Sequence, residues 1–179
     1  SRSGHSAELL TLLLGRCDAK GINTSLVQAA SGGHIHLVKV LLGHNPAADV
    51  LKRALLSSAS KGHTAVLALL IPAVVSDEDR RAALVASCAN SEMAAAALLL
   101  DSLPGPMMDQ PLAICASKGQ EQIGRCILDQ YQTRIVQGDE ASRQHARTAW
   151  DHSRNIARSK GKSAMVELLT ERIDALGLG

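Results

Sequence analysis

The sequence predicts an all-α protein built from repeated pairs of helices. Residues that favour a tight turn recur along the chain at positions 4, 33, 62, 91, 119 and 161, all glycine except Ser91. The first four intervals are nearly equal, about 29 residues each, and the last interval is longer. Such a period is typical of stacked supersecondary units, so we expect residues 1–179 to form a single repeat domain.

Each of these turns lies between two helix-forming segments. Pairs of large aliphatic residues follow the first five turns at the eighth and ninth positions, as in Leu12-Leu13, Leu41-Leu42 and Ile127-Leu128. Small residues end the segments before the turns, as in Ala29-Ala30 and Cys115-Ala116. Each unit is therefore expected to be a short first helix, a turn and a second helix that bury one face against each other.

The chain starts within a unit. Residues 4–14 are predicted to form a second helix that no first helix precedes, so we expect the sequence to be a fragment of a longer protein. Residues 15–23 contain two glycines and are expected to form a loop. Thr24 or Ser25 would then supply the N-cap oxygen of a short first helix that ends at Ser31.

Turn-forming residues divide the rest of the chain. Pro46 and Pro72 end two second helices, because proline removes a backbone donor and restricts the residue before it. Ser76 is expected to cap the next helix, and Ser91, which replaces a turn glycine, to make the most irregular turn. Residues 103–106, Leu-Pro-Gly-Pro, are expected to form a rigid surface loop. Predicted helices span 33–42, 52–60, 62–71, 80–89, 92–100, 120–136, 139–159 and 163–176.

The unit resembles the ankyrin repeat, whose pattern is T-P-L-H-x-A-A-x-x-G-H followed by a second helix that ends in a leucine pair. Residues 110–120, QPLAICASKGQ, match the first half best, and residues 33–42, GHIHLVKVLL, match the second half best. The resemblance implies an ankyrin-like solenoid of stacked units. The period is about four residues shorter than the usual 33. The acidic-glycine finger residues and the histidine of T-P-L-H are missing, so we expect short or missing hairpin fingers.

Composition excludes several classes of partner. The formal net charge of +2 is too small for a polyanion-binding protein, and with a single Tyr, a single Trp and no Phe the chain lacks stacking platforms for nucleic acid. No apolar run approaches the length of about 18 residues at which a transmembrane helix becomes possible.

The four cysteines show no C-x-x-C spacing, so we expect reduced thiols that pack as small hydrophobic groups.

No residue pattern predicts catalysis in this segment, nor a cofactor or a metal. Gly161-Lys162-Ser163 ends like a phosphate-binding loop, but the first glycine of that motif would fall at Ile156. His5, His34 and His63 follow turn glycines, where the ankyrin resemblance implies a turn-stabilising hydrogen bond. We therefore expect no catalytic, cofactor or metal residues, while a longer protein that contains this segment could still be an enzyme.

A row of polar side chains is the candidate binding surface. The ankyrin resemblance implies a concave groove lined by loop tips and by the ends of first helices, just before each turn. Lys61, Lys118 and Lys160 share this position, with Asn90 between the first two. Such a row is equally compatible with a solvated face. Four arginines at helical spacing on one predicted helix face would extend the row: Arg143, Arg147, Arg154 and Arg158.

These features favour a protein–protein interaction module whose partner is a folded protein with an acidic patch. The alternative is a substrate-recognition domain of a larger enzyme. Short, alanine-rich units resemble the ankyrin parts of some bacterial secreted effectors of the OspC type, which hold a host protein such as a caspase for modification. A structural spacer is a third interpretation. We expect a cytoplasmic location, in the host cell if the protein is a secreted effector.

Overall fold

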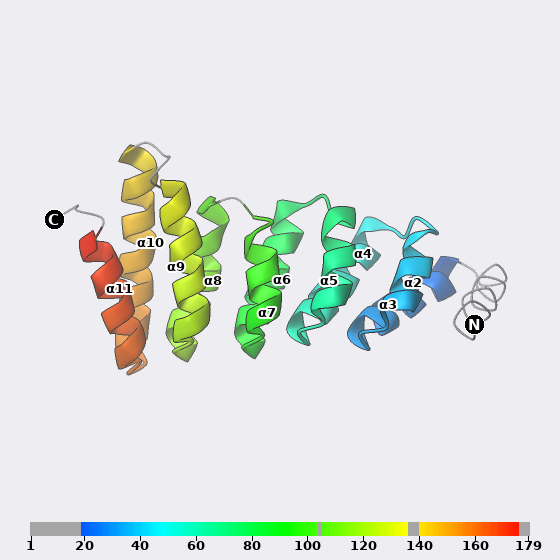
Figure 1. Cartoon of the computed structure of the whole chain (residues 1–179), viewed down its shortest axis with the longest axis horizontal. Helices are drawn as coiled ribbons and strands as arrows, with labels where there is room; N and C mark the ends of the chain where they lie inside the picture. The colour runs from blue at the N-terminus through cyan, green and yellow to red at the C-terminus, as the bar shows by residue number, and fades with distance from the viewer. Residues whose placement is uncertain (1–18, 104, 136–139, 176–179) are drawn as a thin grey trace.

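The computed structural model describes residues 19–103, 105–135 and 140–175. These residues form ten α-helices and two 3₁₀ helices, and none of them lies in a strand (Figure 1). The predicted all-α class is therefore confirmed for the described part of the chain, whereas the predicted helix at 4–14 lies outside it. The helices are α2 (Ala19–Ser31), α3 (Ile35–Leu42), α4 (Ala48–Ser60), α5 (Thr64–Leu70), η1 (Ile71–Ala73), α6 (Asp77–Asn90), α7 (Met93–Leu100), η2 (Gly105–Met108), α8 (Asp109–Lys118), α9 (Glu121–Ile135), α10 (Glu140–Ser159) and α11 (Ser163–Ala175).

Helices that are neighbours in the sequence are also neighbours in space. Each even-numbered helix packs against the odd-numbered helix that follows it, from α2 with α3 to α10 with α11. The even-numbered helices also contact one another in order, and so do the odd-numbered helices. The result is two adjacent rows of helices, with α2 and α11 at opposite ends (Figure 1).

The same left-handed turn joins the two helices of every described pair. Its central residue has φ between 63° and 72°, the region that favours glycine because a side chain is strained there. The next residue donates its backbone N–H to a carbonyl five positions earlier, at 2.9–3.0 Å, and so satisfies the end of the first helix. The central residues are Gly33, Gly62, Ser91, Gly119 and Gly161.

Ser91 makes a turn as regular as the glycine turns, which corrects the expectation of an irregular one. Its φ and ψ are 63° and 27°, close to the 71° and 34° of Gly119. The closing backbone bonds from Ser91 to Cys88 and from Glu92 to Ser87 are both present. These bonds hold the serine in a conformation that it adopts less readily than glycine.

Local signals place several helix ends as predicted. The hydroxyl of Ser76 accepts a hydrogen bond from the backbone N–H of Asp79, so Ser76 is the N-cap of α6. Asn45 has a φ of 49° and precedes Pro46, which separates α3 from α4. Pro72 lies in the 3₁₀ helix after α5. Helix α4 begins about one turn earlier than predicted, at Ala48 and not at residue 52.

Three other predictions were wrong. The segment 15–23 was expected to be a loop, but α2 begins at Ala19, and Gly21 lies inside it. Thr24 does not cap the helix, since its hydroxyl donates to the carbonyl of Lys20 within it. Packing of α2 against α4 outweighs the weak helix propensity of one glycine. Leu103, expected on a surface loop, is 2% exposed and belongs to the core.

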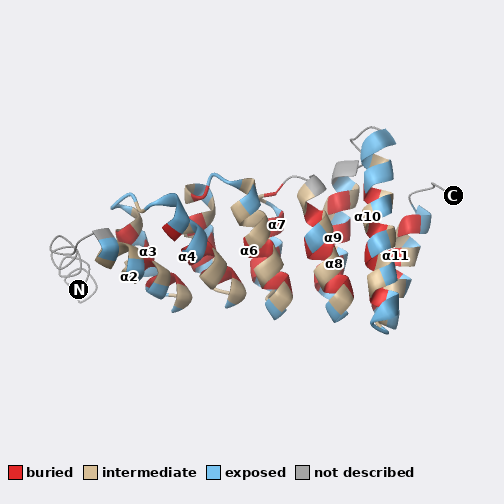
Figure 2. Ribbon diagram, turned by 180° about the vertical axis from the view of Figure 1, so that it is seen from behind, coloured by how far each residue is buried: buried red, intermediate tan, exposed pale blue. Residues whose placement is uncertain are grey.

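The core consists mainly of small and aliphatic side chains from both rows of helices. Buried residues recur along these helices (Figure 2). Cys88 and Cys115 are free, buried thiols within this core, as predicted, whereas Cys17 lies outside the described residues. Three serines are also buried, and each donates its hydroxyl proton to a carbonyl of the preceding helical turn. These buried hydroxyls therefore have hydrogen-bond partners. They are Ser58, Ser87 and Ser153.

Candidate protein-binding surface

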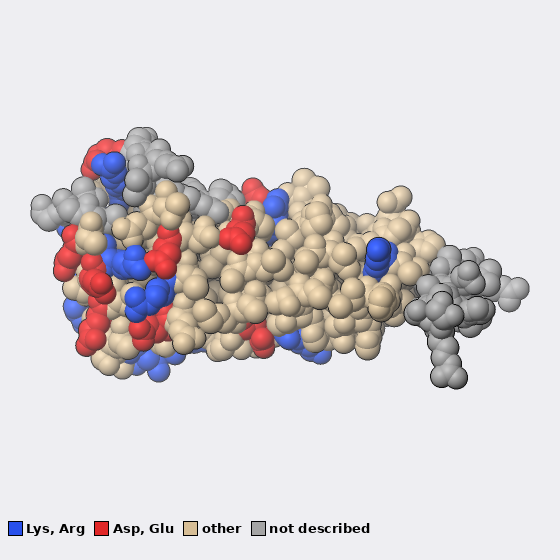
Figure 3. All heavy atoms as spheres, viewed as in Figure 1, with Lys and Arg blue, Asp and Glu red and all other residues tan. Residues whose placement is uncertain are grey.

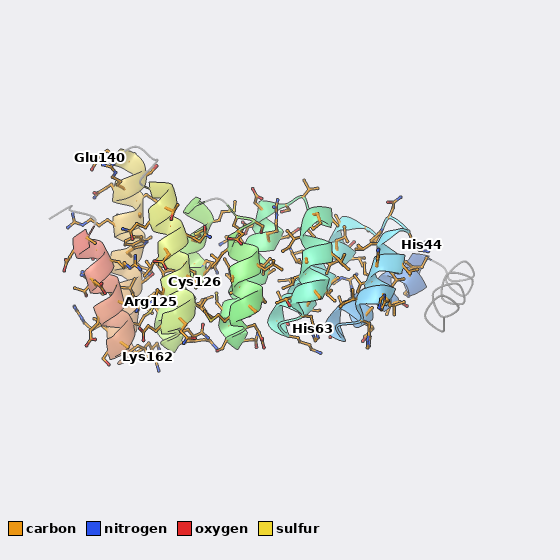
Figure 4. The ribbon with its side chains drawn as sticks, in the orientation of Figure 1. His44, His63, Arg125, Cys126, Glu140 and Lys162 are labelled. Carbon is orange, nitrogen blue, oxygen red and sulfur yellow. The ribbon has the colours of Figure 1, made fainter. Side chains whose placement is uncertain are left out.

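The tight turns gather along one edge of the molecule, which we call the turn edge. We define it as the five left-handed residues, the two residues before each of them and the residue after each. His63 and Lys162, which follow two of the turns, lie at this edge, whereas His44 and Glu140 lie at the opposite edge (Figure 4). The repeated connection thus brings equivalent residues of successive units to one edge.

After four of the five described turns, the next residue reaches back to the turn of the preceding unit. His63 Nε2 lies 3.0 Å from the carbonyl oxygen of Ser31, and a Cβ at Gly33 would lie 2.9 Å from His63 Nδ1. Gln120 donates to the hydroxyl of Ser91 at 2.6 Å. The turn-stabilising role expected for a histidine is therefore confirmed at His63, while His5 lies outside the described residues.

Other residue types occupy the same position in other units. A Cβ at Gly62 would contact the carboxylate of Glu92, and a Cβ at Gly119 would lie 2.8 Å from Lys162 Cδ. Lys162, considered in the sequence as part of a phosphate-binding motif, covers the turn of the preceding unit. From the sequence, a role in stabilising the turn was predicted only for the histidines at this position. The repeat register also identifies the equivalent residue in the other units.

The four predicted groove residues lie at the turn edge and are all exposed. Lys118 Nζ donates to the carbonyl oxygen of Ala89, at the end of the preceding first helix, at 2.6 Å. This contact places a cation where the helix dipole is negative. Asn90 Nδ2 donates to Ala86 within α6 at 2.9 Å. Lys61 and Lys160 have no ion pair or hydrogen bond from their ammonium groups within the described part of the chain.

The predicted arginines run across the rows of helices and do not continue the lysine row. Helix α10 starts near Glu140 at the opposite edge and ends at the turn edge, so only its last residues approach the lysines (Figure 4). Arg143 pairs with Glu140 at 3.5 Å, and Arg147 and Arg154 both pair with Asp151. Arg158, in the last turn of α10, is exposed. Of the four arginines, Arg158 alone lies beside the turn edge.

Open hollows occur along the turn edge. One of about 440 Å³ lies between the end of α2 and Lys61, with His34 and Leu37 also lining it. Another of about 320 Å³ lies between Arg158 and the start of α11. Both are wide and shallow, a shape that suits the side chains of another protein better than an enclosed small molecule.

A hydrogen-bonded cluster at the opposite edge was not predicted from the sequence. The carboxylate of Asp109 accepts from the Tyr131 hydroxyl at 2.7 Å and lies 2.9 Å from His145 Nε2. Burial, and then the hydrogen bond to Asp109, raise the pKa of Tyr131 above its ordinary value. Tyr131 also packs edge-on against Trp150, with 5.8 Å between the ring centres. Both oxygens of Asp109 are engaged by side chains of α9 and α10, so the cluster ties these long helices to α8.

Comparison with known proteins gives no match. A scan against protein-family models finds no match, and a search of curated proteins finds no significant match. Among the described residues, no helix is both long and apolar enough to cross a bilayer.

Proposed function

We propose that this chain is an ankyrin-like solenoid that acts as a protein–protein interaction module. Its turn edge would recruit a folded protein that carries an acidic patch. Repeat arrays bind through extended surfaces of this kind, because neighbouring units present equivalent side chains in a line. Recruitment of a substrate for a larger enzyme would use the same edge.

The observation that carries the proposal is the repetition of one turn geometry in five units. Lys61, Lys118 and Lys160 precede turns with the same backbone closure, at equivalent points of three first-helix ends. No residue in the described part of the chain pairs with the ammonium groups of Lys61 and Lys160, which can therefore pair with a carboxylate of the partner. Lys118 uses one of its three donor hydrogens on Ala89 and keeps two for a partner. Because the hydrogen bond to Ala89 already restrains the Lys118 side chain, Lys118 loses less side-chain entropy on binding than an unrestrained lysine would.

The first step of the test is to capture partners by position. A photo-crosslinking residue replaces Asn90 at the turn edge, and the matched control replaces His44 at the opposite edge (Figure 4). Proteins crosslinked only from position 90, and identified by mass spectrometry, are the candidates. A protein captured equally from both positions is not a turn-edge partner.

The second step reverses charge with a matched control. Lys61, Lys118 and Lys160 are all changed to Glu, which moves the formal net charge from +2 to −4, since each change subtracts 2. The control reverses Lys20, Arg53 and Arg125, which are exposed and lie outside the turn edge, and produces the same net charge. Only the turn-edge triple variant should bind the captured protein more slowly, with a flatter salt dependence of the association rate. Equal association rates for the two variants would refute the proposal.

A further inference from the structure

The exposed faces of α3, α5 and α7 are almost without charge. These three adjacent second helices contain a single Lys, Arg, Asp or Glu residue, Lys39. Charged side chains gather over α9 and α11 in the same row, while the middle of the molecule has few (Figure 3). Ile35 and Met93 are each 41% exposed, at the two sides of this face.

The repeat places equivalent residues on α3 and α7, the two outer helices of this face. Ile35 and Met93 are two periods apart in the sequence, so they occupy equivalent positions at the starts of α3 and α7. Lys39 is equivalent to Ala97 in the same way, and Asp101 follows Ala97 by one helical turn. Helix α5 lies between them and contacts both α3 and α7.

From this arrangement we propose that the exposed face of α3, α5 and α7 binds a second copy of this chain. A two-fold axis parallel to α5 would place α3 of each copy against α7 of the other. Ile35 would then meet Met93 of the other copy. A two-fold contact is self-complementary, so each of these pairings occurs twice.

Charge and side-chain size are complementary in the same arrangement. Lys39 would face Ala97 of the other copy, and its side chain is long enough to reach Asp101 one turn away, because a helical turn rises about 5.4 Å. Both Lys39 and Asp101 are exposed. Asp101 accepts from Gln130 through Oδ1 at 2.8 Å, which leaves Oδ2 for the lysine. Ala65 and Ala68 are exposed on α5 and are small enough for two α5 helices to approach closely near the axis.

The size of the face sets the expected affinity. Helices of 7 or 8 residues are about 12 Å long, and packed helices lie about 10 Å apart. Three of them cover a few hundred Å², less than the roughly 800 Å² that each partner buries in a standard interface. The dimer should therefore be weak and in reversible exchange with the monomer.

Sedimentation equilibrium of the 179-residue chain tests the proposal between about 10 μM and 1 mM, the range of a weak complex. The weight-average mass should rise toward twice the monomer mass. Ala68→Glu, which places two carboxylates near the axis, should keep the chain monomeric. Gln122→Glu, an exposed change on α9, should leave the dimer intact. A monomeric wild-type chain, or a dimer that persists in Ala68→Glu, would overturn the proposal.

A charge exchange tests the orientation of the two copies. Lys39→Glu should weaken the dimer about tenfold, because two attractive pairs become repulsive. Combining Lys39→Glu with Asp101→Lys should restore most of that loss, since each pair is attractive again. A double variant as weak as Lys39→Glu alone would exclude the two-fold arrangement along α5. Circular dichroism melting of each variant checks that the fold is retained.

Discussion

Different contacts stabilise the regular units, α2 to α7, and the last two helix pairs, α8 to α11. The second helices α3, α5 and α7 have 8, 7 and 8 residues, whereas α9 has 15 and α10 has 20. Near the N-terminal end, small and aliphatic side chains hold neighbouring units together. The long helices rise past their neighbours at the edge opposite the turns (Figure 1). There the chain uses its two large aromatics and the Asp109 cluster.

This difference shows what a change of period requires. Where the interval between turns stays constant, each unit presents the same shape to the next, and alanine and leucine can repeat with it. The longer interval between Gly119 and Gly161 lengthens two helices, so their added surface has no counterpart in the preceding units. Larger side chains and specific hydrogen bonds fill and fix that surface.

The largest expected effect is at Trp150, the bulkiest fully buried side chain in the described part of the chain. Trp150→Ala should lower the free energy of unfolding by about 3–5 kcal/mol, because it removes buried apolar surface and leaves a cavity. Trp150→Phe should cost less, since it keeps a ring for Tyr131 and the indole N–H has no acceptor in the described structure. Denaturant unfolding measures both variants. Similar losses for Ala and Phe would show that ring packing contributes little here.

The turn glycines are next in expected effect. Gly119→Val should cost on the order of 2 kcal/mol, because valine is strained at a φ of 71° and its side chain must displace Lys162. Gly161, in the last turn, has a φ of 66°, but apart from its chain neighbours no described residue has an atom within 4 Å of the point where a Cβ would be. Gly161→Val should therefore cost somewhat less.

Ser91→Val is the internal control for this comparison, because that turn already contains a side chain. It should destabilise the chain less than either glycine substitution. Thermal melting of the three variants under one condition gives the order. Equal shifts at all three positions would contradict the shared turn geometry as the source of the cost.

Sequence periodicity was sufficient to predict the helix pairs and the positions of the turns between them. A left-handed helix end needs glycine or a tolerant polar residue, so Gly33, Gly62, Gly119 and Gly161 mark it directly. The predicted starts of α2 and α4 were less accurate, because packing between units extends these helices beyond the residues that local signals indicate. Helix α2 is the clearest case, since it includes Gly21.

The candidate site was predictable only where the register is constant. The contact between Lys118 and Ala89 spans 29 residues, and the contact between Gln120 and Ser91 spans the same distance, so the period itself relates these positions. Asp109 contacts residues 22 and 36 positions away. These separations depend on how the long helices α9 and α10 pack, which the repeat period does not specify.

The smallest expected effect concerns the Tyr131 hydroxyl. Tyr131→Phe keeps the ring against Trp150 and removes one donor to Asp109, so it should cost about 1 kcal/mol at neutral pH. In the folded chain the pKa of Tyr131 is raised, and in the unfolded chain it is close to its ordinary value of about 10. The tyrosine contribution to stability is therefore complete below about pH 10.

Above that pH the unfolded chain loses the Tyr131 proton while the folded chain retains it, so this contribution falls as the pH rises. Urea unfolding of the wild type and of Tyr131→Phe, at pH 7 and between about pH 10 and 11, isolates it from the lysines that titrate in the same range. The stability difference between the two proteins should shrink at high pH. A difference that stays constant would mean that the hydroxyl ionises equally in both states, and the hydrogen bond to Asp109 would not be a tie between α9 and α8.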